Sequence, residues 1–229
     1  MKVAVLQSNY IPWKGYFDII HDVDLFIFHD DLQYTKNDWR NRNRIQTEGG
    51  LKWLTVPVGT DEHRLILDVS MQDTSWQKKH YDMICAAYRR APYFEKYRPF
   101  LEQVYLSQKW DYLYELDRYL IEHISTDFLG IQTKFADSRA FATHGVKHEK
   151  LLSMLQSAGA DLYVSGPAAK DYICFEDYQK AGIQLVWKDY GGYPVYPQQY
   201  GEFEHGVSIL DLLLNTGEEA PDYIWGWRK

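Results

Sequence analysis

The stretch VAVLQSNYIPWKGYFDIIHDVDLFIFH, residues 3–29, contains two short apolar runs separated by a loop and a helical pattern. The runs Val3–Gln7 and Asp24–His29 predict strands, and Tyr16–Val23 predicts a short helix between them. Strand, loop, helix and strand in this order are typical of a parallel sheet, in which ligands bind beyond the carboxyl ends of the strands. We therefore predict an α/β fold in which helices flank a mostly parallel sheet.

The rest of the chain continues this pattern around a helical block. Residues 75–130 have helical periodicity, and we predict a helical insertion or subdomain there, within a single domain that spans residues 1–229. Before this block, we predict a hairpin of two strands, Trp53–Val58 and Leu65–Val69. After it, the patterns predict strands at Thr133–Ala136, Asp161–Ser165 and Ile183–Lys188, and helices at Lys147–Ala158, at Phe175–Lys180 and from the capping box at Ser208 to the residue before Gly217.

Composition narrows the class of protein. The 229-residue chain is 45% hydrophobic and has a net charge of −7, which disfavours general nucleic-acid binding. Cys85 and Cys174 provide neither a disulfide framework nor a cysteine zinc site, and they fit a reducing cytoplasm. The N-terminal apolar run is too short for a signal peptide, and no run approaches the roughly 18 apolar residues of a membrane span. We expect a cytoplasmic protein without a membrane span.

The hexapeptide WRNRNR, residues 39–44, is a basic cluster in this acidic chain. In an extended segment its arginines would line one side and its asparagines the other, whereas in a helix only the first and last arginines would share a face. Three guanidiniums on one side could bind phosphate or carboxylate through paired hydrogen bonds. The alternative is a solvated loop whose arginines pair with acidic side chains. The candidate anion-binding residues are Arg40, Arg42 and Arg44, with Asn41 and Asn43 for orientation and Lys36 and Asn37 just upstream.

Other loops carry further candidates. Aromatic rings and amines near strand ends and helix starts suit the stacking of a base or sugar and the binding of an anion. These candidate binding residues are Gln7, Tyr10, Trp13, Lys14, Lys147, Ser165, Gly166, Tyr190 and Tyr196. The candidate acid–base residues are His29, Asp30 and Asp171, with Lys170 as a reactive lysine. Core packing, helix capping and ordinary surface turns are the alternative explanations for these residues. His144 and His148 lack a third metal ligand at a suitable spacing, so we predict no metal site.

Several segments, taken together, resemble the WbqC-like protein family. They are LQSNYIPWKGYF (6–17), WRNRNRI (39–45), WLTVPV (53–58), ADLYVSGP (160–167) and SILDLL (208–213). The sequence departs from the family pattern at Ser8, where a proline is expected after the glutamine. The resemblance implies a role in bacterial O-antigen and surface-polysaccharide biosynthesis. The implied activity is transfer of glycine, or a similar small acyl group, to the amine of a nucleotide-linked amino sugar.

The residues suggest how such a substrate would be bound, and they leave alternatives open. Arginines would bind the diphosphate, tyrosine or tryptophan would stack on the base, and an aspartate or histidine would take the proton of the amine. The protein could instead use ATP and Mg²⁺ to form an acyl-adenylate as an amide ligase, or bind a sugar nucleotide without catalysis. An aminoacyl-tRNA donor would require a broader basic face than this chain offers. No other cofactor is implied.

Overall fold

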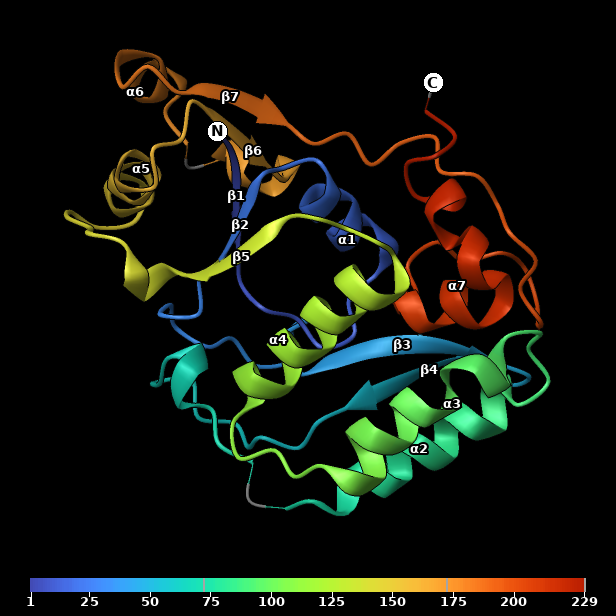
Figure 1. Ribbon diagram of the computed structural model, residues 1–229. Coiled ribbons are helices and arrows are strands. Elements are labelled where there is room, and N and C mark those ends of the chain that lie inside the picture. The colour runs from blue at the N-terminus through green and yellow to red at the C-terminus, as the bar shows by residue number, and fades with distance from the viewer. Residues whose placement is uncertain (72, 172, 229) are drawn as a thin grey trace.

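The computed structural model describes residues 1–71, 73–171 and 173–228, and its five-stranded parallel sheet lies in the upper part of Figure 1. Its strands are β1 (Lys2–Leu6), β2 (Leu25–Phe28), β5 (Lys134–Asp137), β6 (Leu162–Ser165) and β7 (Gln184–Trp187). They pair in the order β5-β2-β1-β6-β7, and each pair is parallel. The predicted α/β fold is confirmed, and each predicted strand of this sheet overlaps an observed one.

Helices cover both faces of the sheet, because successive side chains of a strand point to opposite faces. On one face, the ring of Tyr16 in α1 (Lys14–His21) lies 5.6 Å from the ring of Phe26. On the other face, the alternate side chains of β1 and β2 join a buried cluster with α5 (His148–Ser157) and α6 (Phe175–Lys180). Burial on both faces explains why these strands are continuous apolar runs in the sequence.

The order of the strands reverses between β1 and β6. The chain runs outward from β1 to β2 and β5, and later adds β6 and β7 on the other side of β1. In open parallel sheets, the carboxyl ends of the strands at such a reversal border the usual ligand crevice. The loops that begin at Gln7 and at Gly166 leave these two ends. The aromatic loop after β1 therefore lies at the predicted edge of the sheet.

A separate antiparallel hairpin carries the arginine segment, in the lower half of Figure 1. It consists of β3 (Arg42–Thr47) and β4 (Gly50–Thr55), and β3 contacts α2 (Ser75–Tyr88). The block 75–130 is helical, as predicted. It comprises α2, α3 (Phe94–Glu102), α4 (Leu113–His123) and two π-helical turns, Gln103–Ser107 and Ile124–Phe128. Its status as an insertion in a single domain stays a prediction.

The hairpin corrects one predicted pairing. The partner of β4 is β3, with Arg44 opposite Trp53, and not the segment Leu65–Val69. That segment contains a 3-10 turn at Ile66–Asp68 in place of the predicted strand. Only residues 48 and 49 separate Thr47 from its partner Gly50, which has a left-handed φ of 91°. A short connection containing glycine closes a hairpin at lower entropic cost than the longer segment around residues 59–64.

The last helix, α7 (Ile209–Thr216), begins at the predicted cap. Ser208 Oγ accepts a hydrogen bond from an amide of the first turn at 3.2 Å. The capping box is only half formed, because the Ser208 amide already donates to a carbonyl of β3. Asp211 instead accepts from the hydroxyl groups of Tyr88 at 2.7 Å and Tyr196 at 2.8 Å. The buried carboxyl of Asp211 therefore joins α7 to α2 and to the loop around Tyr196.

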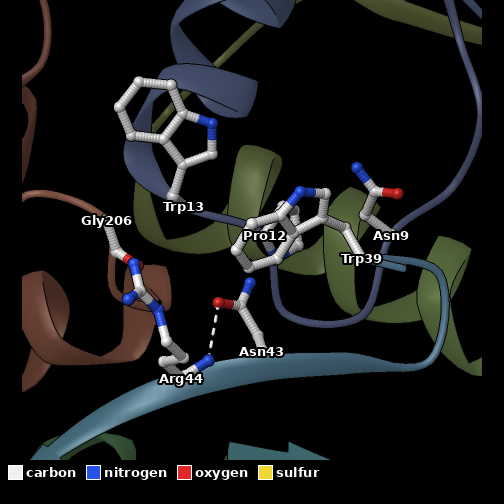
Figure 2. Close-up of a pocket in the computed structure, with 7 residues that line it drawn as sticks. All are labelled: Asn9, Pro12, Trp13, Trp39, Asn43, Arg44 and Gly206. Atoms are coloured by element: carbon white, nitrogen blue, oxygen red, sulfur yellow. Dashed lines mark hydrogen bonds between the residues drawn. The ribbon is translucent and has the colours of Figure 1, made fainter. Parts of the chain in front are cut away.

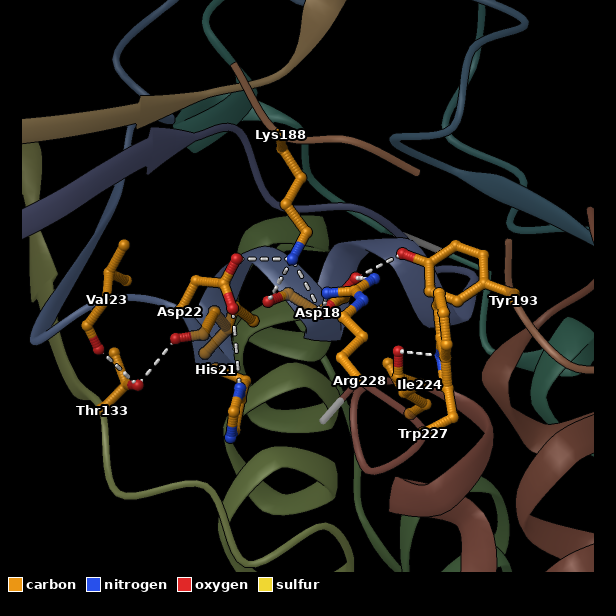
Figure 3. A network of polar contacts seen from close by, with 11 residues as sticks. Asp18, His21, Asp22, Val23, Thr133, Lys188, Tyr193, Ile224, Trp227 and Arg228 are labelled. Atoms are coloured by element: carbon orange, nitrogen blue, oxygen red, sulfur yellow. Dashed lines mark hydrogen bonds and ion pairs between the residues drawn. The ribbon is translucent and has the colours of Figure 1, made fainter. Parts of the chain in front are cut away.

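The end of the chain returns to α1 (Figure 3). Arg228 donates to both carboxylate oxygens of Asp18, at 2.5 and 2.9 Å. The same carboxylate binds Lys188 at 2.8 Å and Tyr193 at 2.5 Å, and Lys188 also reaches Asp22 at 2.5 Å. Since Asp18 is fully buried, these donors offset the cost of removing its charge from water. The contacts fasten the C-terminal segment and the start of the 189–207 segment to α1.

Candidate functional site

Buried amide groups join the arginine segment to the loop after β1. Asn43 Nδ2 donates to the carbonyl of Ile11 at 2.9 Å, and the Tyr10 amide donates to the carbonyl of Trp39 at 3.0 Å. Asn41 and Asn43 are buried, whereas Arg42 and Arg44 are half-buried, which fits the predicted alternation of asparagines and arginines. The two asparagines hold the backbone in place, and Asn43 also borders the pocket described next.

A pocket of about 290 Å³ opens between these two segments (Figure 2). Its lining consists of Asn9, Pro12, Trp13, Trp39, Asn43, Arg44 and Gly206. The two indoles come from different segments, Trp13 from the end of the β1 loop and Trp39 from the turn before β3. The guanidinium of Arg44 lies at one side and donates to the carbonyl of Gly206 at 2.9 Å. The lining therefore combines two flat apolar rings, amide groups and one cation, which suits a flat ring that carries an anionic group.

The three arginines do not form one row. Only Arg42 and Arg44 belong to β3, and their guanidinium carbons lie 4.4 and 5.8 Å from the ring centre of Trp53. Arg40 lies in the turn before the strand, because the chain bends at residues 39–41. Its guanidinium donates to the side-chain oxygens of Gln7 and Asn9. The expectation of three guanidiniums along one strand face is wrong. The segment instead supplies one arginine to the pocket and one to the carboxyl end of β1.

The two residues upstream of this segment lie apart from the pocket lining. Lys36 is exposed and forms an ion pair with Glu62 at 2.9 Å. Asn37 has a left-handed φ of 56°, and its carbonyl accepts a hydrogen bond from the guanidinium of Arg42. Both residues shape the turn that leads into β3, and neither is among the residues that line the pocket.

Asp30, a candidate base, is held by internal partners. Its side chain is fully buried and accepts from the amide of Ser8 at 2.7 Å and from Arg118 Nε at 2.7 Å. Arg118 also donates to Asp137 at 2.6 Å, so one guanidinium connects the carboxyl ends of β2 and β5. These hydrogen bonds occupy both carboxylate oxygens of Asp30, which suits a structural role at the sheet edge better than proton transfer.

Lys14 and Tyr196 point into the protein. Lys14 is 2% exposed, and its ammonium lies 5.0 to 5.6 Å from the ring centres of Tyr193, Tyr196 and Phe203. Burial lowers the pKa of Lys14 to about 8. The hydroxyl of Tyr196 binds the buried carboxyl of Asp211. The 189–207 segment thus encloses the lysine in aromatic rings, outside the lining of the pocket.

The other aromatic candidates differ in their placement. Tyr10 is fully buried, and its hydroxyl contacts Tyr105 at 2.7 Å and His80 Nδ1 at 2.8 Å, which is a core arrangement. The ring of Tyr190 packs on that of Trp13 with 5.3 Å between the centroids. A Cβ placed on Gly166 would lie 3.7 Å from the Tyr190 hydroxyl. Tyr190 therefore connects the loop after β6 to the indole of the pocket.

The remaining candidates lie at the margins of this region. Ser165 is buried at the end of β6, and Lys147 is exposed at the start of α5 with a left-handed φ of 49°. Lys170 lies 5.6 Å from the ring centre of Trp187. Asp171 ends a 3-10 turn, and its side chain lies outside the described part of the structure.

Asp117 is a buried carboxyl that is absent from the candidates predicted from the sequence, because those candidates come from loops, strand ends and helix starts. It lies on α4 between Leu116 and Arg118, inside the apolar stripe of that helix, and the signal in the sequence is a charged residue on that stripe. Its side chain is fully buried, and neither oxygen has a hydrogen-bond partner among the residues that the structure describes. Burial, and then the nearby Asp30, raise the pKa of Asp117 well above its usual range, against the opposing charge of Arg40.

The fold and the pocket together define an open parallel α/β protein whose candidate ligand site, with aromatic walls and an arginine, lies at the carboxyl end of β1. The chain belongs to the WbqC-like protein family, which it matches over residues 7–223. It is similar to the uncharacterized protein Rv1507c of Mycobacterium tuberculosis (strain ATCC 25618 / H37Rv), with 45% identity over 225 residues that make up 97% of each chain.

Two features are absent from residues 1–71, 73–171 and 173–228, the ranges that the structure describes. None of the helices in these ranges is both long and apolar enough to cross a membrane. The same ranges hold no group of three or more His, Cys, Asp or Glu side chains placed to bind a metal ion.

Proposed function

We propose that this protein is a cytoplasmic transferase of bacterial surface-polysaccharide biosynthesis. It attaches glycine, or a similar small acyl group, to the amine of a nucleotide-linked amino sugar. Membership of the WbqC-like family supports the biosynthetic setting. One observation carries the proposal for the substrate. The indoles of Trp13 and Trp39 and the guanidinium of Arg44 line one pocket, at the edge where open parallel sheets bind ligands.

The pocket suits the nucleotide part of such a substrate. Stacking of a base on an aromatic side chain contributes about 1–3 kcal/mol to the free energy of binding, whichever base it is. Arg44 uses one amino group on the carbonyl of Gly206, and a guanidinium has five N–H donors, so others can bind phosphate. At about 290 Å³, the pocket is at the small end for ligand sites and fits one ring system rather than a whole sugar nucleotide. The sugar would therefore extend beyond it.

Acyl transfer sets further demands at the sugar end. The amine attacks as a neutral nucleophile, so a base must accept its proton, and donors must stabilise the oxyanion that develops on the acyl group. The donor would be an activated acyl group, either an acyl-adenylate made from ATP and Mg²⁺ or an aminoacyl ester.

A non-catalytic sugar-nucleotide-binding protein is the second candidate. It is favoured by the internal partners of one candidate base, because Ser8 and Arg118 occupy both carboxylate oxygens of Asp30. Turnover separates the two candidates. The protein is incubated with UDP-glucosamine, glycine, ATP and Mg²⁺, and the products are analysed by mass spectrometry. An amide product supports the transferase, and AMP formed with it supports the acyl-adenylate route. Saturable binding without product, across both kinds of donor, supports the binding protein.

Arg44→Gln tests the phosphate contact. We expect it to weaken binding of UDP by about 10- to 150-fold, since a hydrogen bond to a charged group contributes about 1.5–3 kcal/mol. Arg42→Gln is the matched control, because Arg42 lies on the same strand and stacks on Trp53 outside the pocket lining. Isothermal titration calorimetry measures both. Equal affinity of the two variants would exclude Arg44 as the phosphate ligand.

A further inference from the structure

The position of His29 follows from the register of the sheet. Leu6 pairs with Phe28, and the amide of His29 donates to the carbonyl of Leu6 at 2.9 Å, so Gln7 and His29 continue the same register beyond the two strands. Partnered residues of parallel strands point to the same face, and Val5 and Ile27, two positions earlier, point toward α5. Gln7 and His29 are therefore neighbours at the carboxyl edge of the sheet, on the face that α5 covers.

A row of polar contacts leads from the pocket to this position. Asn9 lines the pocket, and its side-chain oxygen accepts from one amino group of Arg40. The other amino group of Arg40 donates to the side chain of Gln7, the neighbour of His29. A nucleotide whose base lies in the pocket would direct its diphosphate and sugar along this row. The edge of the sheet then places His29 beyond the phosphates, where the amino sugar would lie.

The surroundings of His29 suit a proton acceptor. Its side chain is about nine-tenths buried, and Nε2 has no hydrogen-bond partner in the described ranges. Asp31 Oδ1 lies 3.6 Å from Nε2, beyond hydrogen-bond distance, and catalytic contacts of this kind often shorten only when substrate binds. Lys150 at 2.5 Å and the Ser138 hydroxyl hold the Asp31 carboxylate in place.

Burial keeps His29 neutral at pH 7, and the charges that face it act on its pKa in both directions. Burial, which disfavours the imidazolium, lowers the pKa of His29, and Lys150 acts in the same direction. Asp31 and Asp30 oppose this effect without reversing it. Although burial opposes it, hydrogen bonds from Lys150 and Ser138 lower the pKa of Asp31, so its carboxylate stays charged and able to orient a histidine.

We infer that His29 is the catalytic base of the proposed transferase and that Asp31 is its positioning residue. The inference rests on the proposed function. The amine nitrogen bonds to the acyl carbon, and one of its protons passes to Nδ1 of His29, while the N–H of Nε2 faces Asp31. The bond between the acyl carbon and the carrier oxygen then breaks, and the carrier leaves with the electron pair of that bond. The imidazolium returns its proton to the departing carrier or to water, which restores the neutral base. Asp31 stabilises the imidazolium while it exists.

A binding experiment tests this assignment without turnover. Nuclear magnetic resonance spectra of the protein labelled with ¹⁵N in histidine and tryptophan are recorded while UDP, UDP-glucose and UDP-glucosamine are added separately. His29→Asn identifies the imidazole signals of His29. We expect all three ligands to shift the indole signals of Trp13 and Trp39. Only UDP-glucosamine, which carries the amine, should shift the His29 signals strongly.

Two outcomes of the binding experiment contradict different statements. If UDP-glucosamine shifts the indole signals and leaves those of His29 unchanged, the role of His29 is wrong and the nucleotide pocket stands. If the three ligands leave the indoles unchanged, the nucleotide pocket is wrong, and the role of His29 falls with it.

Kinetics give the second readout once turnover is established. We expect His29→Asn to lower kcat by about 10²- to 10⁴-fold, the usual contribution of a general base, with KM within threefold of the wild-type value. The fall in kcat/KM that protonation of His29 causes at acidic pH should disappear in this variant. Asp31→Asn should lower kcat less than His29→Asn does, and it should shift the pH at which kcat/KM falls. His144→Asn, in an exposed loop, is the control and should keep the wild-type pH profile. A His29→Asn enzyme with wild-type kcat would overturn the assignment.

Discussion

At the residue scale, two buried carboxyl groups show how partners decide the consequence of burial. Asp211 accepts hydrogen bonds from Tyr88, Tyr196 and Gln198. Asp117 is equally removed from water, and its two oxygens lack partners within the described ranges. Burial raises the pKa of both groups, but hydrogen bonds oppose it at Asp211. A buried acceptor without a donor is costly, so Asp117 reduces the stability of the fold at neutral pH.

Matched Asp→Asn variants test this difference. The pKa of Asp117 is higher in the folded than in the unfolded protein, so stability is lost as pH rises from about 4, the unfolded value, through the folded pKa. Asp117→Asn should therefore raise the free energy of unfolding at pH 7 and change it little at pH 3. Asp211→Asn should lower it by about 1–3 kcal/mol, because the amide nitrogen cannot accept from a tyrosine hydroxyl. Urea denaturation measures the free energy of unfolding of both variants. If both lose the same free energy of unfolding at pH 7, the difference between Asp117 and Asp211 is refuted.

At the element scale, the 189–207 segment is a long connection without helix or strand that is fastened at identifiable points. Tyr193 and Tyr196, together with Phe203, enclose the ammonium of Lys14. Gly206, at its end, borders the pocket through the contact with Arg44. The order of this segment therefore affects the shape of the pocket.

Lys14→Met tests the aromatic enclosure through pH. The pKa of Lys14 is about 8 in the folded protein, below the 10.5 of an exposed lysine, so folding disfavours the charged form. Stability should rise as pH increases from 8 toward 10.5, as folded and unfolded lysines both become neutral. Methionine keeps the apolar volume without a charge. We expect Lys14→Met to melt at a higher temperature than the wild type at pH 7 and to converge with it by pH 10. A constant difference across this range would contradict the explanation.

The elements also show which features of the structure can be predicted from the sequence and which cannot. The strands of the parallel sheet follow from apolar runs such as Val3–Gln7, because burial on both faces requires them. Asn43 lies on the opposite face of β3 from Arg42 and Arg44 because side chains of a strand alternate, which the sequence also predicts. The partner of Arg40 and the enclosure of Lys14 depend on segments that are distant along the chain. Local periodicity carries no information about such contacts, and the same limit explains the wrong pairing of Leu65–Val69.

At the scale of the whole molecule, the strand reversal between β1 and β6 brings the functional candidates to one edge of the sheet. The arginine segment reaches this edge from a separate hairpin, and the C-terminal segment secures α1 behind it through Arg228 and Asp18 (Figures 1 and 3). A net charge of −7 with a local guanidinium favours a small anionic ligand at one place over an extended nucleic-acid surface.

Calorimetric titration of UDP into Trp39→Ala and Phe175→Ala tests the nucleotide pocket most directly. Trp39, which is 43% exposed, lines the pocket, whereas Phe175, which is 53% exposed, begins α6 and is not part of the pocket lining. We expect Trp39→Ala to raise Kd by about 5- to 150-fold, the equivalent of about 1–3 kcal/mol of base stacking, and Phe175→Ala to change it less than threefold. Equal affinities of the two variants, or no binding of UDP to the wild-type protein, would contradict a nucleotide site between Trp13 and Trp39.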